Sequence, residues 1–304
     1  MEEKQSIFKK IHTDRFRWND FFIIPMFLTY IMIIAGEVLG QLIIGLLFGN
    51  AIAKDETGFL EITTMYLLFI GMWIITLLCI VVSKGNRPVL KALWTAPKGN
   101  NVKYLLLGLL IGFVTNMICA ITAMINKDIS IYYDSFPFLQ LVIIFIAVFI
   151  QSSAEELVCR GFLYYRLRRG YRHPAVAIVL NALLFASIHV GNPGVSNLAL
   201  LDIFVTGIFF SLMVYYLDSI WCAMAAHAAW NYTQNIILGL PNSGIVSPFS
   251  IFKLDAASAT DSFAYSVAFG LEGTILSTVV MAAGCVVLYV LFHNKEVKAY
   301  DPWN

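Results

Sequence analysis

The sequence predicts an all-α fold, a polytopic membrane helix bundle of about eight transmembrane helices. Hydrophobic residues make up 59% of the 304 residues and charged residues only 13%, whereas an average soluble domain is about 45–50% apolar and about 25% charged. Eight apolar stretches approach the length of about 20 residues that a membrane helix needs. The net charge of only +1 argues against a nucleic-acid partner, because polyanion binders carry a strong basic excess.

The predicted helices are separated by short polar segments, with no internal repeat and no low-complexity linker. Residues 1–304 are therefore predicted to form a single membrane domain, in which residues 1–20 are a mixed-charge cytoplasmic tail. The first apolar stretch is longer than the apolar core of a signal peptide, about 7–15 residues, so we expect it to be retained. The eight stretches are 21–48, 62–83, 104–125, 138–164, 174–190, 198–217, 219–239 and 270–292.

The basic residues test this division of the chain. If the N-terminus lies inside, almost all of the 20 Lys and Arg residues fall in cytoplasmic segments, and the exceptions are Lys54, Lys127 and Lys253. Such a bias is typical of a correctly oriented membrane protein. It predicts a multi-pass protein of the cell membrane with both termini in the cytoplasm.

The five cysteines do not point to a site of their own. None belongs to a C-x-x-C pair, and each lies in or beside an apolar run. Neither a disulfide framework nor a thiolate zinc site is expected.

The strongest chemical signal is a group of charges inside the fourth predicted helix, around Glu155, Glu156 and Arg160. Ionisable residues inside membrane helices are costly and mark functional sites by default. Glu156 and Arg160 are four residues apart, which suits a helical ion pair. Glu155 points about 100° away and keeps no partner in this motif, so it is a candidate general base. The alternative is a pair of interfacial charges.

Two further motifs follow on later predicted helices. Phe185 and His189 share one helix face, and His227 and Asn231 share a face at the same spacing. Imidazole and carboxamide groups can both donate hydrogen bonds to an oxyanion. A single histidine of this kind is more often a packing residue, but three such pairs on three helices favour a site.

The ordered pattern E-E-x-x-x-R, F-x-x-x-H and H-x-x-x-N resembles the CPBP family of intramembrane endopeptidases (CAAX proteases and bacteriocin-processing enzymes, also called Abi). The resemblance covers about residues 138–240 of the chain. The resemblance implies that Glu155 and His189 activate a water molecule and that His227 and Asn231 form an oxyanion hole. It also implies that Glu156 and Arg160 hold the first motif in shape and that Phe185 packs beside His189.

The resemblance leaves the use of a metal open, because the family is often described as metal-dependent although a metal-free mechanism has also been proposed. Glu155, His189 and His227 could supply three ligands of an open zinc site. However, the chain contains no H-E-x-x-H motif, the usual helical zinc-protease signature. We favour water activation without a metal and keep a divalent metal such as zinc as the alternative cofactor.

The predicted helix ends leave one discrepancy. At 1.5 Å per residue, Glu155 and His227 would lie about 13 Å below the cytoplasmic edge, whereas His189 would lie about 22 Å below it. This mismatch suggests that a predicted helix end is wrong.

Other polar residues in apolar surroundings have simpler explanations. Glu37 lies among small residues that permit close helix contact, and we favour a structural role over contact with substrate. Asp202 and Glu272 resemble helix N-terminal carboxylates that complement the dipole. The basic stretch 166–172 is predicted to be a topology anchor, and 241–269 an outer loop.

The predicted function is an intramembrane endopeptidase that hydrolyses a peptide bond of a membrane-associated protein or peptide, in CAAX-type, bacteriocin or pheromone processing. One alternative is a non-catalytic bacteriocin-immunity protein or scaffold with the same fold, which predicts eroded motifs. Another is a proton-coupled transporter using Glu37, Glu155 and Asp202, which predicts internal repeats. The sequence shows neither feature.

Overall fold

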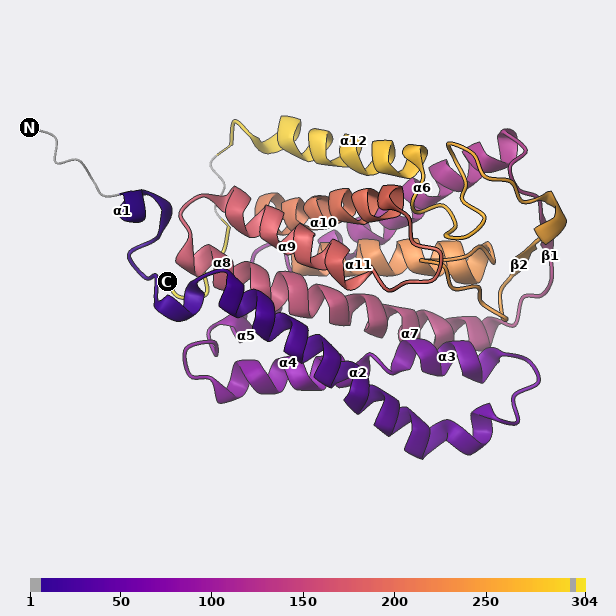
Figure 1. The fold of residues 1–304 in the computed structure, drawn as a ribbon, viewed down its shortest axis with the longest axis horizontal. Coiled ribbons are helices and arrows are strands. Elements are labelled where there is room, and N and C mark those ends of the chain that lie inside the picture. Colours follow the sequence, from indigo (N-terminus) through magenta and orange to yellow (C-terminus); the bar gives the residue numbers. More distant parts are fainter. Residues whose placement is uncertain (1–6, 296–298) are drawn as a thin grey trace, which may run out of the picture.

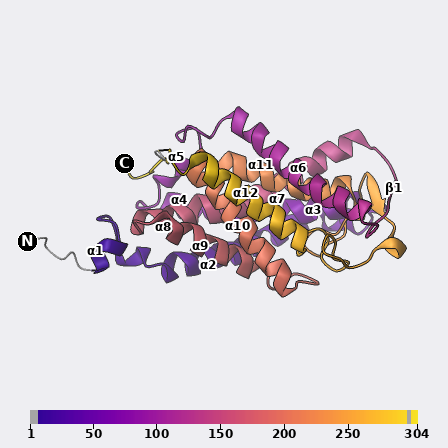
Figure 2. The same ribbon diagram turned by 90° about the horizontal axis from the view of Figure 1, so that it is seen from above.

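The computed structural model describes residues 7–295 and 299–304. In this part of the chain the structure is a helical bundle with one small sheet (Figures 1 and 2). The helices are α1 (Ile7–Ile11), α2 (Ile23–Ile52), α3 (Phe59–Leu67), α4 (Ile70–Val82), α5 (Val89–Leu93), α6 (Val102–Ile125), α7 (Phe138–Glu156), α8 (Tyr164–Gly170), α9 (Pro174–Ile188), α10 (Asn197–Leu217), α11 (Ile220–Asn231) and α12 (Ile275–Phe292). Two π-helical segments, Leu157–Leu163 and Tyr232–Ile237, continue α7 and α11.

The predicted class, an all-α polytopic membrane bundle, is confirmed. Among the described residues, six helical stretches are long and apolar enough to cross a bilayer: Ile23–Ile52, Phe59–Val82, Val102–Ile125, Phe138–Gly170, Asn197–Leu217 and Ile275–Phe292. All eight predicted stretches contain a helix. However, α9 has 15 residues and α11 has 12, fewer than the about 20 that a span needs.

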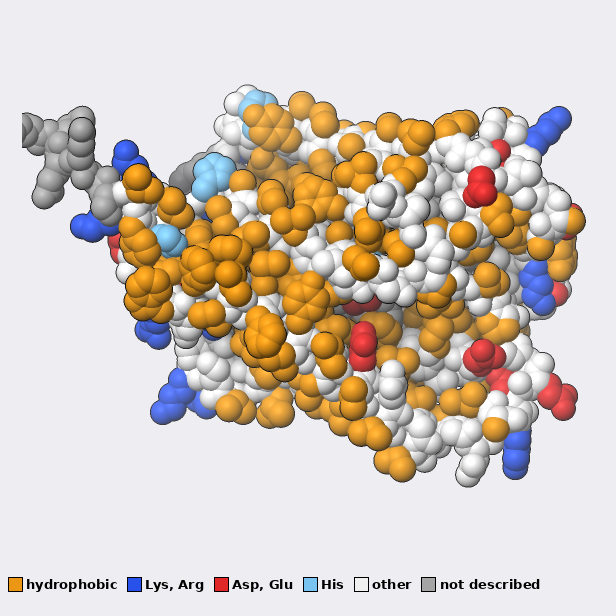
Figure 3. All heavy atoms as spheres, viewed as in Figure 1, with side chains coloured by type: hydrophobic (Ala, Val, Ile, Leu, Met, Phe, Trp, Pro, Cys, Tyr) orange, Lys and Arg blue, Asp and Glu red, His pale blue; other side chains and the backbone are white. Residues whose placement is uncertain are grey.

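The buried centre of the bundle is formed by the motif-bearing helices. In the apolar part of the stretch Phe138–Gly170, 67% of the residues are buried, whereas in α12 the corresponding share is 17%. Every residue of α11 except Trp221 is buried, and this helix packs against α6, α7 and α10. Hydrophobic side chains cover the middle of the face in Figure 3, with Lys and Arg toward its two ends. This distribution suits an integral membrane protein whose outer helices contact lipid.

Glycines let α2 and α4 approach closely, as the small residues around Glu37 predict. A Cβ atom on Gly40 would lie 1.7 Å from the carbonyl oxygen of Leu68. A Cβ on Gly36 would lie 2.5 Å from the Cα of Met72. Small residues commonly permit this kind of contact between membrane helices.

The basic stretch 166–172 does more than the predicted topology anchor. Arg166 and Arg169 are buried and form ion pairs with Asp20, which is 0% exposed. The distance from Arg166 Nη2 to Asp20 Oδ1 is 3.0 Å. The N-terminal segment is thus attached to α8, and residues 1–6 of the predicted tail lie outside the described residues.

Both ends of the described chain lie at the same end of the bundle (Figure 1). The backbone N–H of Tyr300 donates to Asp218, and the indole of Trp303 donates to the carbonyl of Gly85. The opposite end carries the sheet, in which β1 (Ile131–Tyr133) pairs antiparallel with β2 (Phe252–Leu254). The segment 241–269, predicted as a loop, therefore contains a strand.

Candidate active site

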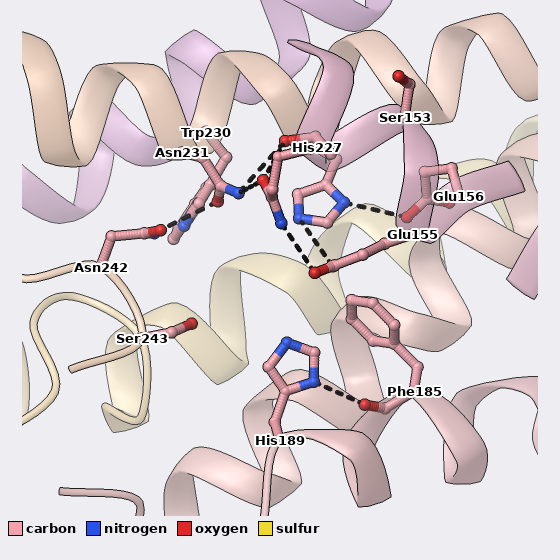
Figure 4. Close-up of polar contacts among 12 residues, drawn as sticks. Ser153, Glu155, Glu156, Phe185, His189, His227, Trp230, Asn231, Asn242 and Ser243 are labelled. Atoms are coloured by element: carbon pink, nitrogen blue, oxygen red, sulfur yellow. Dashed lines mark hydrogen bonds and ion pairs between the residues drawn. The ribbon is translucent and has the colours of Figure 1, made fainter. Parts of the chain in front are cut away.

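The three motifs lie at the C-terminal ends of the three α-helices α7, α9 and α11. Glu155 and Glu156 end α7 immediately before its π-helical segment, and Asn231 ends α11 before the other. His189 is the C-cap of α9. Single π-helical turns often occur at functional sites, because they reorient the side chains around them. The structure brings the motif residues together around one space (Figure 4).

Glu155 has one carboxylate oxygen held and one free. Glu155 as a whole residue is 7% exposed, and its Oε1 accepts a hydrogen bond of 2.8 Å from Gln151 Nε2. Its Oε2 has no hydrogen-bond partner among the described residues, although His227 Nε2 lies 3.7 Å away. A buried carboxylate with an unpaired oxygen is well placed to accept a proton.

Glu156, Arg160 and His227 form one buried ionic group. Arg160 Nη1 donates to Glu156 Oε1 at 3.0 Å, as the spacing predicts, and the ring of His227 contacts the same oxygen through Nδ1 at 3.1 Å. Since an ionised carboxylate can only accept, Nδ1 carries the proton of this bond. Glu156 therefore orients the imidazole of His227, which also stacks on Phe210.

His189 approaches the space from α9 and is half-buried. Its Nδ1 lies 2.7 Å from the carbonyl oxygen of Phe185. Because a carbonyl oxygen can only accept, Nδ1 donates here and Nε2 of the neutral ring carries a lone pair. Nε2 points toward the space that also faces Glu155 and Asn242 (Figure 4). The predicted packing of Phe185 beside His189 is present, with ring centroids 4.9 Å apart.

Asn231 belongs to a chain of amides that the sequence did not reveal. Its Nδ2 donates to Gln151 Oε1 at 3.1 Å and to Ser152 Oγ at 3.3 Å. Its Oδ1 accepts from Asn242 Nδ2, which also donates to Glu272. The amides thus connect Glu155, through Gln151, with Glu272. Both carboxylates can only accept, and they fix the orientation of every amide between them.

Glu272 differs from its predicted role as a helix N-terminal carboxylate. Thr274, not Glu272, caps α12. Glu272 instead accepts hydrogen bonds from Trp230, Asn242 and both the backbone and hydroxyl of Ser243. It thereby joins the segment after α11 to the start of α12.

Asp202 was also predicted to complement its own helix dipole. It is 1% exposed, and its Oδ2 accepts a hydrogen bond from the backbone N–H of Gly273 at 3.1 Å. This carboxylate therefore connects α10 with the segment that precedes α12.

The discrepancy in depth is explained by a wrongly predicted helix end. The fourth span continues to Gly170 instead of ending near 164. At about 1.5 Å per residue, Glu155 lies about 22 Å from that end, the same depth as His189 below Pro174. Ile220, at the start of α11, lies beside Gly161. The helix that carries His227 therefore begins deeper in the bundle than Gly170 does, and His227 reaches the depth of Glu155.

A cavity of about 470 Å³ contains these groups. It is lined by Glu155, His189, His227 and Asn231. Glu156 and Arg160 are not among its lining residues. Apolar and aromatic side chains of α2, α3, α4 and α10 form most of the remainder. Figure 3 shows a hollow in the middle of this face, with acidic side chains at its edge and hydrophobic ones around it.

The proposed metal ligands do not form a compact set. Among the described residues, no three His, Cys, Asp or Glu side chains lie close enough to hold one ion. Glu155 and His227 approach each other within 3.7 Å, but His189 does not complete a ligand group. The described cysteines are all free thiols.

Buried Glu and His side chains lie inside a helical bundle of the membrane-spanning type. Residues 137–233 match the family model described as Rce1-like, type II CAAX prenyl endopeptidase Rce1-like. The matched segment begins at α7 and includes all three motifs. This match supports an intramembrane protease of the CPBP (CAAX protease) family, as the resemblance of the motifs implies. No curated protein and no solved structure matches the chain.

Proposed function

We propose that the protein is an endopeptidase in which Glu155 and His189 activate a water molecule against a peptide bond. Its substrate is a membrane-associated protein or peptide that enters the cavity from the bilayer or its surface. The observation that carries the proposal is that Glu155 lines the same cavity as both histidines and has a buried Oε2 without a hydrogen-bond partner among the described residues. Titratable groups converging in one mostly apolar pocket are the usual mark of an active site.

The proposed reaction uses the geometry of these groups. Glu155 takes one proton from water while the oxygen attacks the carbonyl carbon of the substrate. The lone pair of His189 Nε2 accepts the second water proton in a hydrogen bond and so orients the attack. Glu155 then returns its proton to the departing nitrogen, so that one water and one amide give an acid and an amine.

His227 and Asn231 are proposed to stabilise the oxyanion. With Nδ1 bonded to Glu156, His227 can offer only its Nε2–H, which it carries when the ring is protonated. Asn231 donates both amide hydrogens in this structure, and the 3.3 Å bond to Ser152 is the weaker of the two. Release of that bond frees one donor. Hydrogen bonds that strengthen as charge develops lower the barrier.

We favour this mechanism without a metal, since Glu155 and His189 can accept the protons of water and His227 can donate a hydrogen bond to the oxyanion. The alternative zinc site requires movement of His189 toward Glu155 and His227. A strong chelator separates the two. Activity that the chelator leaves intact supports the metal-free reaction, and loss that added zinc reverses supports the zinc site.

The membrane orientation is proposed from the same structure. Both ends of the described chain lie beside the Arg-rich end of α8. The positive-inside rule places such an end in the cytoplasm, and we propose the cell membrane as the location.

The test of function compares purified wild type with Glu155→Gln on a peptide library and on membrane-protein extracts. Gln keeps the size of the side chain but cannot take a proton. We expect cleavage products from wild type and none from the variant. Glu61→Gln, which changes an exposed carboxylate on α3 outside the cavity, is the control. Identical product profiles for wild type and Glu155→Gln favour a non-catalytic scaffold or immunity protein instead.

A further inference from the structure

Apart from the two histidines, the Asp, Glu, Lys and Arg side chains that line the cavity are all acidic. Its lining includes the four carboxylates of Glu37, Glu155, Asp202 and Glu272, and no Lys or Arg among the described residues. Arg160 is separated from it by the rings of Phe185 and Phe210. Field lines in a low-dielectric cleft are focused, so a cationic group is attracted there and an anionic group is repelled.

Three of these carboxylates already have donors. Gln151 holds Glu155, the backbone of Gly273 holds Asp202, and four hydrogen bonds hold Glu272. Glu37 differs, because it makes no hydrogen bond or ion pair with any residue in the described ranges. A partly buried carboxylate inside a membrane helix is costly unless something pairs with it.

Glu37 lies near the middle of α2. It is half-buried and faces the cavity. Around it the wall is apolar, formed by side chains such as Ile33, Ile34 and Met72. A substrate chain lying against Glu155 therefore passes a single unpaired negative charge in apolar surroundings.

We propose that Glu37 selects substrates that carry a basic side chain, Lys or Arg, close to the bond that is cut. The inference rests on the proposed function and adds a substrate class to it. The ammonium or guanidinium group pairs with the Glu37 carboxylate, while the neighbouring peptide bond faces Glu155. Substrates with an acidic residue at this position are disfavoured, because their charge meets four carboxylates.

The test is a cleavage-site profile on a randomised library of N-acetylated peptides, with the protein purified in detergent micelles. Acetylation removes the α-amino charge, so that only side chains supply cations. A hydrogen bond to a charged group contributes about 1.5–3 kcal/mol, and each 1.4 kcal/mol is tenfold in a binding constant. Wild type is therefore expected to prefer Lys or Arg over Met or Leu by about tenfold or more at one position.

Two variants and a control complete the test. Glu37→Gln is expected to abolish the preference, Glu37→Lys to shift it toward Asp and Glu, and Glu61→Gln to leave it unchanged. A wild-type profile without enrichment of basic residues overturns the proposal, and so does a preference that persists in Glu37→Gln. The wild-type profile decides even where a variant fails to fold. Cleavage that persists in Glu155→Gln refutes the proposed function separately.

Discussion

Arg160 is the buried charge whose loss has the most predictable effect on stability. Its side chain is 0% exposed, Nη1 donates to Glu156, and Nη2 donates to the carbonyl oxygen of Gly207 at 3.0 Å. The guanidinium carbon also lies 4.3 Å from the ring centroid of Phe185. The substitution Arg160→Met keeps the length of the side chain and removes all of these polar contacts.

The expected loss of unfolding free energy follows from the buried Glu156 carboxylate that remains in the Arg160→Met variant. Removing one partner of a buried ion pair costs about 3–5 kcal/mol, and in Arg160→Met the Glu156 carboxylate stays buried with His227 as its remaining partner. The double variant Glu156→Leu/Arg160→Met removes both charges and leaves the His227 Nδ1–H without an acceptor, at a cost of about 1–3 kcal/mol. The double variant should therefore be more stable than Arg160→Met alone, by about 2 kcal/mol.

The assay is denaturant or thermal unfolding in one detergent, followed by intrinsic Trp fluorescence, together with peptide cleavage. Recovery of stability in the double variant should not restore cleavage, because His227 is no longer oriented. A double variant that loses the sum of the two single losses would refute the reasoning. So would an Arg160→Met variant that loses less than about 1 kcal/mol, the range of an exposed pair.

Two more predictions concern positioning and packing. Gln151→Leu removes the donor to Glu155 Oε1, so kcat should fall about tenfold or more with little change in KM. Gln151→Glu tests the loss of the donor separately. An unchanged kcat for Gln151→Leu would contradict the positioning of Glu155 by Gln151. Gly40→Val places a side chain on the carbonyl of Leu68 and should lower the unfolding free energy by at least about 1–3 kcal/mol. Leu46→Val on the exposed face of α2 is the matched control, and equal melting temperatures for the two variants would contradict this packing.

The sequence predicted the membrane class and the motif residues because both depend on local patterns. Composition alone distinguishes lipid from water as the environment of the outer helices. The pairing of Glu156 with Arg160 follows from helical spacing, and the structure confirms it. The helix end at Gly170 could not be read in the same way, because the buried Arg166 and Arg169 look like a solvated loop until Asp20 is known to neutralise them.

The rest of the site depends on contacts between segments far apart in the chain. Gln151 and Asn242 are common polar residues without a distinctive spacing, and their partners are up to 80 residues away. The only sequence signal was the position of Gln151 one turn before Glu155 on the same helix face. The bond from His227 to Glu156 was missed for the same reason. The catalytic roles assigned to the motif residues stay predictions until the variants are measured.

The attachment of Asp20 to α8 has a consequence for the order in which the chain folds. Asp20 is synthesised before its partners Arg166 and Arg169, which follow 146 and 149 positions later. Until then its carboxylate has no cation to neutralise it and stays in water. The N-terminal segment can therefore reach its final place only after the fourth span has been inserted. Contacts between residues so distant in sequence form late and slowly. The docking of the N-terminal segment on α8 is therefore a late step of folding.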